Sequence, residues 1–193
     1  MPPLPERNNV QEEWERHERA DRIITASGAN IKHVQGYRAF YRPCSDEIVL
    51  PERGQFETAD RYYATLLHEL GHWTGHESRL IRDLKNPFGS EEYAKEELRA
   101  EIASLMAGND LGLGHDPGQH AAYVKSWVKV LRDDPMEIMR AAADAEKIMN
   151  MVLSFERTQT QTQDEINTQG QADKQQSQPV PTLTVTDLTK TEH

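Results

Sequence analysis

The segment His68-Glu69-Leu70-Gly71-His72 matches the HExxH signature of zinc hydrolases. Residues four apart lie on one face of a helix, so the two imidazoles can bind a single zinc ion at about 2.0–2.1 Å. Glu69 then lies toward the open side of the metal. A chance match in a charge-rich surface helix is the alternative, because any short motif carries a risk of false positives.

The residues before the motif predict that it lies on a half-buried helix. Thr58 is a suitable N-cap, and Gly75, three residues after His72, predicts where the helix ends. Between them, apolar side chains recur at helical spacing: Ala59, Tyr62, Tyr63, Leu66, Leu67 and Leu70. After Gly75 the chain can turn and supply a third ligand.

The third metal ligand has more than one candidate. In the longer metzincin pattern, H-E-x-x-H-x-x-G-x-x-H, Gly75 fits but Ser78 stands where the last histidine belongs. That pattern is therefore not met. His76 is close in sequence, but it follows the glycine turn, where a partly exposed polar residue is the competing interpretation.

A second acidic helix, predicted from Ser90 to Met106, offers a glutamate. Tyr93, Glu97 and Glu101 form one line along it, each four residues after the last. Two carboxylates at this spacing repel each other unless a cation lies beside them. We therefore predict Glu97 as the third zinc ligand and Glu101 as the acceptor for the spare ring N–H of a ligating histidine. Tyr93 is a candidate oxyanion donor. An ordinary solvated glutamate face is the alternative.

Three stretches together resemble a known family: HELGHWTGH (residues 68–76), SRL (78–80) and EELRAE (96–101). From Tyr41 to about Leu153 the chain is similar to the zincin-like metallopeptidase domain shared by the antirestriction protein ArdC and the plasmid primase TraC. The resemblance implies an α+β, gluzincin-type fold in which E-x-x-A-[acid] supplies the ligand Glu97 and the supporting acid Glu101. It also implies a metallopeptidase of mobile elements, acting in plasmid transfer or antirestriction.

Shorter patterns predict the scaffold around these helices, about five helices in all. A first helix ends at Gly28, and three short strands follow, Ala29–Val34, Tyr37–Arg42 and Glu47–Leu50, which we expect to form a small antiparallel sheet. By the resemblance, Glu47–Leu50 is a candidate edge strand that pairs with an extended peptide.

Two further helices are predicted to start where Asp precedes Pro, at Asp116-Pro117 and at Asp134-Pro135. His120 lies on the apolar side of the first. A core histidine and a residue that assists an oxyanion are the two interpretations of His120.

The chain divides into three predicted parts. Residues 1–28 form the N-terminal helix of the domain, and residues 29–155 form the zincin-like core. Residues 156–193 are rich in Gln and Thr and lack apolar periodicity, so we expect a disordered tail that cannot bury enough apolar surface to offset its ordering entropy.

Composition excludes several classes of protein. One cysteine, Cys44, rules out a disulfide framework and a cysteine-rich zinc site. The net charge of −10 and the lack of clustered Lys and Arg do not favour nucleic-acid binding, so association with single-stranded DNA is expected only through a domain absent here. No apolar run could span a membrane and no signal peptide is visible, which predicts a cytoplasmic protein without a membrane partner.

The sequence thus predicts a zinc metalloprotease that hydrolyses a protein or peptide substrate. Zinc is held by His68, His72 and Glu97, and Glu69 accepts the proton of the attacking water. The alternative is a non-proteolytic, zinc-stabilised accessory module in conjugation, antirestriction or DNA priming. Glu69 discriminates between them, because a structural zinc site does not need it.

Overall fold

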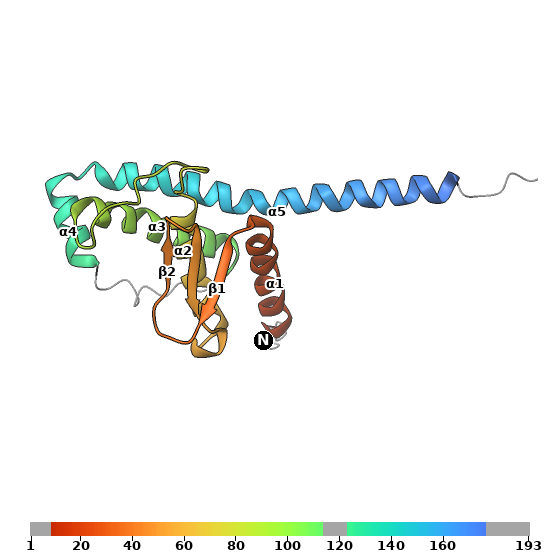
Figure 1. The fold of residues 1–193 in the computed structure, drawn as a ribbon, viewed down its shortest axis with the longest axis horizontal. Coiled ribbons are helices and arrows are strands. Elements are labelled where there is room, and N and C mark those ends of the chain that lie inside the picture. Colours follow the sequence, from red (N-terminus) through yellow and green to blue (C-terminus); the bar gives the residue numbers. More distant parts are fainter. Residues whose placement is uncertain (1–8, 114–122, 177–193) are drawn as a thin grey trace, which may run out of the picture. The chain divides into compact units, whose positions relative to one another are not determined.

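The structure of the protein is a computed structural model that describes residues 9–113 and 123–176. The chain divides into two compact units, Met1–Thr158 and Gln159–His193. In order, the elements are α1 (Asn9–Ser27), β1 (Asn30–Val34), β2 (Phe40–Arg42), β3 (Glu47–Pro51), a 3-10 turn (Arg53–Gln55), α2 (Ala59–Trp73), α3 (Glu91–Asp110), α4 (Val124–Asp133) and α5 (Glu137–Gln176) (Figure 1). The described residues therefore have the predicted α+β architecture of five helices and a small sheet.

The sheet differs from the prediction in its topology. Its strand order is β1-β3-β2, with β1 parallel to β3 and β2 antiparallel to β3. The expected all-antiparallel sheet is wrong, and Glu47–Leu50 lies in the central strand rather than at an edge. The physical reason is burial, since every residue of β3 is buried, as suits a strand covered on both faces. The edge strand next to α2 is β2.

The core lies where α2 packs against the sheet and against α1. Successive turns of α2 supply its apolar side chains, as the helical periodicity predicted. Burial of this surface is the main stabilising contribution to the fold. The largest fully buried apolar side chains of this cluster are Ile23, Ile48, Leu50, Leu66, Leu70 and Val152.

The helices α2 and α3 pack closely because small residues meet between them. A Cβ added at Gly71 would lie 3.5 Å from the Cα of Ala100, which is itself fully buried. Both helices begin at the predicted caps: the Thr58 hydroxyl accepts the N–H of Arg61 at 3.2 Å, and the Ser90 hydroxyl accepts that of Tyr93 at 3.1 Å. The close approach brings the two faces predicted to bind metal toward each other.

The C-terminal half departs from the predicted boundaries. The helix start at Asp116-Pro117 and His120 lie outside the described residues. The helix predicted to start at Asp134-Pro135 begins slightly later, because α5 starts at Glu137. Asp134 forms a turn before it, in which its carboxylate accepts the N–H of Met136 at 3.1 Å.

Residues 156–176, the first part of the predicted disordered tail, are drawn as a continuation of α5, which ends at Gln176. Extending a formed helix adds one hydrogen bond per residue fixed, and the Gln, Ala, Glu and Lys residues of this stretch have favourable helix propensities. An apolar face is not required for such a continuation. In the part of the chain that the structure describes, no helix is long and apolar enough to cross a membrane.

Candidate metal centre

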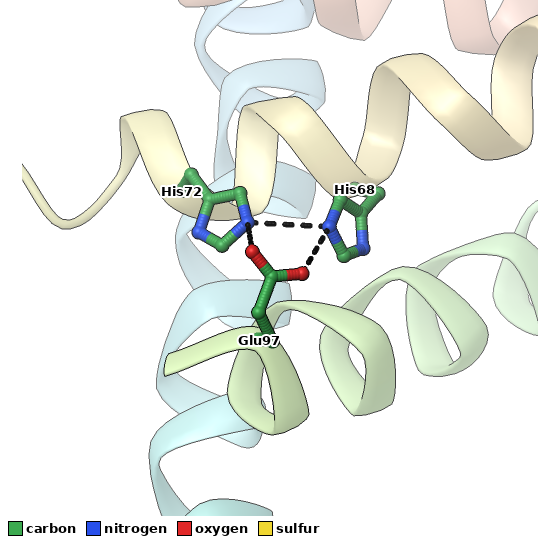
Figure 2. Close-up of side chains that lie close together, drawn as sticks. All are labelled: His68, His72 and Glu97. Atoms are coloured by element: carbon green, nitrogen blue, oxygen red, sulfur yellow. Dashed lines mark hydrogen bonds and ion pairs between the residues drawn. The ribbon is translucent and has the colours of Figure 1, made fainter. Parts of the chain in front are cut away.

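Three side chains from α2 and α3 converge on one point (Figure 2). The Nε2 atoms of His68 and His72 are 3.2 Å apart, and the Glu97 carboxylate lies 3.4 Å from the first and 3.6 Å from the second. Ligand atoms placed tetrahedrally around zinc at about 2.0–2.1 Å would be about 3.3–3.4 Å apart. The spacing of these three groups therefore fits a single metal ion, and the structure brings together the three residues predicted as ligands.

The surrounding charge also fits a cation. Four buried carboxylates, those of Glu69, Glu96, Glu97 and Glu101, surround the two imidazoles, and among the described residues the guanidinium of Arg82 contacts Glu96. Arg82 offsets one of these charges, and the imidazoles, when neutral, offset none of the others. Buried charge without compensation is costly, so a divalent cation would offset the excess.

The same carboxylates shift the ionisation of the candidate ligands. Burial lowers the pKa of His68, but its contacts with Glu101 and Glu97 outweigh burial and raise that pKa to about 10. Burial raises the pKa of Glu97, but hydrogen bonding and charge from His68 and His72 hold it at about 2. The site thus attracts positive charge, whether a proton or a metal ion.

Each imidazole has a second carboxylate behind it. Nδ1 of His68 lies 3.3 Å from Oε2 of Glu101, the residue predicted for this position. Nδ1 of His72 lies 3.2 Å from Oε1 of Glu96. A carboxylate at Nδ1 favours the tautomer in which Nε2 is free to bind a metal.

The sequence analysis did not predict that Glu96 supports His72. From the sequence alone, Glu96 is one of several charged residues in a run. Arg82, in the loop after α2, holds Glu96 with Nε and Nη2 at 3.0 and 2.9 Å and also donates to the carbonyl of Gly71 at 2.6 Å. A Cβ at Gly75 would lie 2.9 Å from Nη2 of Arg82 and 3.0 Å from the carbonyl oxygen of His72. Gly75 therefore leaves the space that Arg82 occupies, beyond its predicted role in ending the helix.

Glu69 is buried beside the three candidate ligands. Burial raises the pKa of Glu69, and the nearby imidazoles of His68 and His72 oppose the rise. The backbone of Tyr41, in the edge strand β2, also has a lowering effect on this pKa. A carboxylate with a raised pKa in this position suits proton transfer.

Tyr93 lines the same cavity, and its phenol helps to lower the pKa of Glu97. Its hydroxyl oxygen is 3.3 Å from that of Tyr123. Burial and these contacts raise the pKa of Tyr93, so the phenol keeps its proton and can donate.

His76 is not part of the converging group. Its Nδ1 lies 2.8 Å from the hydroxyl of Ser78 and accepts the N–H of Ser78 at 3.2 Å. Among the described residues, the histidines and acids close enough to share an ion are His68, His72 and Glu97.

The three groups open onto a cavity of about 360 Å³. It extends from the edge strand β2 across the face of α2 to the loop before α3, and both polar and aromatic side chains line it. Those lining it besides the metal centre include Tyr37, Arg38, Phe40, Tyr41, Asp83, Leu84, Phe88 and Tyr123.

Residues 18–144 match the sequence profile of the zincin-like metallopeptidase family. The chain belongs to this family. Two proteins named DNA primase TraC from Escherichia coli are 65% and 64% identical over 159 residues, and an uncharacterised Sinorhizobium fredii protein, y4eC, is 44% identical over 149 residues. These matches include 82%, 82% and 77% of this chain. They span 11% and 15% of the TraC proteins and 46% of y4eC, so the chain is much shorter than the relatives it matches.

The zincin-like fold is also seen in solved structures of the antirestriction ArdC protein from plasmid R388. The Mn(II)-bound structure superposes with a TM-score of 0.67 at 42% identity, over 72% of this chain and 52% of that one. A metal-free structure of ArdC gives a TM-score of 0.65, also at 42% identity, over 72% of this chain and 50% of that one.

Proposed function

We propose that this protein is a zinc-dependent metallopeptidase of the plasmid-transfer and antirestriction type. One observation carries the proposal: buried Glu69 lies beside His68, His72 and Glu97 at a cavity. Structural zinc sites are usually closed by four protein ligands, whereas catalytic sites keep one position open. Three converging side chains on the wall of a cavity match the second pattern.

The residues of this site support peptide hydrolysis in distinct ways. Zinc, when bound, would supply a water of lowered pKa and polarise the scissile carbonyl. Glu69 would take the proton from the attacking water and pass it to the leaving amine, a task that its raised pKa favours. Tyr93, which keeps its proton, would donate to the oxyanion.

Zinc is the metal we propose because the converging set contains two imidazoles and one carboxylate. Manganese prefers oxygen ligands, although ArdC from R388 was solved with Mn(II). Titration of the metal-free protein with each ion, in competition with a chromogenic chelator, tests this choice. We expect zinc to bind more tightly, and stronger binding of manganese would contradict it.

The change Glu69→Gln tests the proposed chemistry. It preserves the shape of the side chain and removes the proton acceptor, so we expect cleavage of a labelled, denatured protein to fall by about 10²-fold or more. Metal content and Tm should stay nearly unchanged. Glu77→Gln, the same change at an exposed position after the motif, is the matched control and should cleave as the wild type does. Equal cleavage by both variants would contradict a role for Glu69 in catalysis.

A second candidate is a non-proteolytic, metal-stabilised accessory module. The names of its relatives favour it, because they refer to DNA priming and antirestriction rather than to proteolysis. Transfer of plasmid DNA into a host with active restriction separates the two. If wild type and Glu69→Gln protect the DNA equally well and neither cleaves protein, the accessory module replaces the peptidase as the better explanation.

A further inference from the structure

Aromatic side chains from separate elements gather at one side of the cavity. Phe88, in the loop before α3, lies 5.2 Å from the ring of Tyr93 and 6.4 Å from that of Tyr123, and the two tyrosine rings are 6.0 Å apart. We call these three residues the aromatic wall. All three line the cavity, and Tyr93 lies one turn before the candidate ligand Glu97 on α3.

Phe88 is the exposed member of the wall, whereas Tyr93 and Tyr123 are half-buried. Phe88 has 82% of its surface accessible, although it is apolar and sits at a site with two aromatic neighbours. Such a ring contributes little to the stability of the fold, because folding has not removed it from water. It would become buried if a ligand placed an apolar group against it, which is how exposed apolar patches at clefts commonly function.

Strand β2 also contributes to the lining of the cavity. Phe40 and Tyr41 line the cavity, and β2 is an edge of the sheet that pairs with β3 alone. An edge strand offers unpaired backbone groups to an extended peptide, while pockets beside it select alternate side chains. A peptide paired with β2 would therefore lie at the same cavity as the aromatic wall.

Charge favours a peptide over a nucleic acid. The carboxylates of Glu69, Glu96 and Glu97 line the cavity together with that of Asp83, and among the described lining residues Arg38 is the one Lys or Arg. Nucleic-acid sites depend on clustered Lys and Arg that neutralise phosphates. The carboxylates that line the cavity repel phosphates and acidic side chains. They do not oppose the binding of an apolar side chain.

We propose that the aromatic wall is a specificity subsite, which binds a large apolar or aromatic side chain of an extended peptide next to the metal centre. The cavity, about 360 Å³, has room for one such side chain and a short stretch of backbone. This inference rests on the proposed function for the nature of the ligand, but binding by the wall does not require cleavage.

Binding of short peptides by the full chain tests the subsite. The protein carries Glu69→Gln so that no peptide is consumed, and it is assayed both with zinc and metal-free. Fluorescein-labelled hexapeptides with an alanine background and one central Phe, Ala or Glu are titrated by fluorescence anisotropy. We expect the Phe peptide to bind about tenfold more tightly than the Ala peptide, and the Glu peptide to bind most weakly.

Variants of the wall identify where the selectivity comes from. Phe88→Ser should make the Phe and Ala peptides bind alike, and Phe88→Leu should restore part of the difference. Met139→Ser removes an exposed apolar side chain from α5, outside the cavity, and should change neither peptide. Circular dichroism confirms that the variants are folded, which the exposure of Phe88 leads us to expect.

Several results would overturn the subsite. They are a lack of binding, equal binding of the Phe and Ala peptides, or selectivity that survives Phe88→Ser. Tighter binding of a labelled oligothymidylate that depends on Phe88 would replace the subsite with base stacking. Selective peptide binding by a wild-type protein that cleaves nothing would refute the peptidase and keep the subsite. Cleavage without preference for any side chain would keep the peptidase and refute the subsite.

Discussion

Glu96 supports His72 from behind, with its Oε1 3.2 Å from Nδ1 of the imidazole and its carboxylate held by Arg82. Glu101 has the equivalent relationship with His68. One helix, α3, thus carries the candidate ligand Glu97 and the supporting carboxylates of both histidines. Residues on neighbouring positions of a helix point in different directions, which is how adjacent glutamates reach different partners.

We expect Glu96→Ala to weaken metal binding about 10–100-fold, because His72 loses the group that orients its ring. Competition with a chromogenic chelator measures the change. Glu92→Ala, an exposed glutamate on the same helix, is the control and should bind metal as the wild type does. Unchanged affinity in Glu96→Ala would show that His72 is oriented by other contacts.

Arg82→Met should lower the free energy of unfolding by about 3–5 kcal/mol, since it leaves the buried Glu96 carboxylate without its guanidinium. Chemical denaturation measures this loss. The matched control is Arg61→Met, which breaks the exposed pair with Glu57 and should cost less than about 1 kcal/mol. Equal losses in the two variants would mean that Arg82 contributes no more than a surface ion pair.

The ligand assignment predicts an order among three substitutions. Glu97→Ala should lose the metal, Glu101→Ala should weaken binding about 10–100-fold, and His76→Ala should retain it. Metal content after zinc-replete expression and gel filtration measures all three. Loss of metal in His76→Ala, with retention in Glu97→Ala, would show that the third ligand is misassigned.

Metal-free protein should show a pH dependence that comes from His68. Its pKa is raised from 6.5 to about 10, so the charged imidazole stabilises the fold fully below pH 6.5, and this contribution is lost as the pH rises through about 10. Metal affinity should rise over the same interval, because the proton must leave first. Nitrogen-15 NMR of the metal-free protein should show a protonated His68 at pH 8. Titration of His68 near 6.5 would contradict the effect of Glu97 and Glu101.

Local patterns predicted much of the site. The HExxH spacing and the cap at Thr58 specify a helix whose one face carries both histidines, and such features depend only on neighbours in sequence. The position of Glu97 followed from its repulsion with Glu101 at one-turn spacing. The structure places both carboxylates beside His68, although their roles stay predictions.

Features that depend on distant contacts were not predictable in this way. The central position of β3 is decided by which strands cover it, and three short strands allow several orders. Arg82 lies in an irregular loop, and no periodicity indicates that its guanidinium returns to Glu96. The pair Glu96-Glu97 could have suggested two separate partners, because side chains at consecutive helix positions point in different directions.

Anomalous diffraction from crystals grown with zinc is the most direct test of the metal centre. We expect one strong peak at the zinc edge, about 2.0–2.1 Å from Nε2 of His68, Nε2 of His72 and a carboxylate oxygen of Glu97, with one position facing the cavity. A peak bound by His76, a site closed by a fourth protein ligand, or no peak between α2 and α3 would contradict an open metal centre at this position.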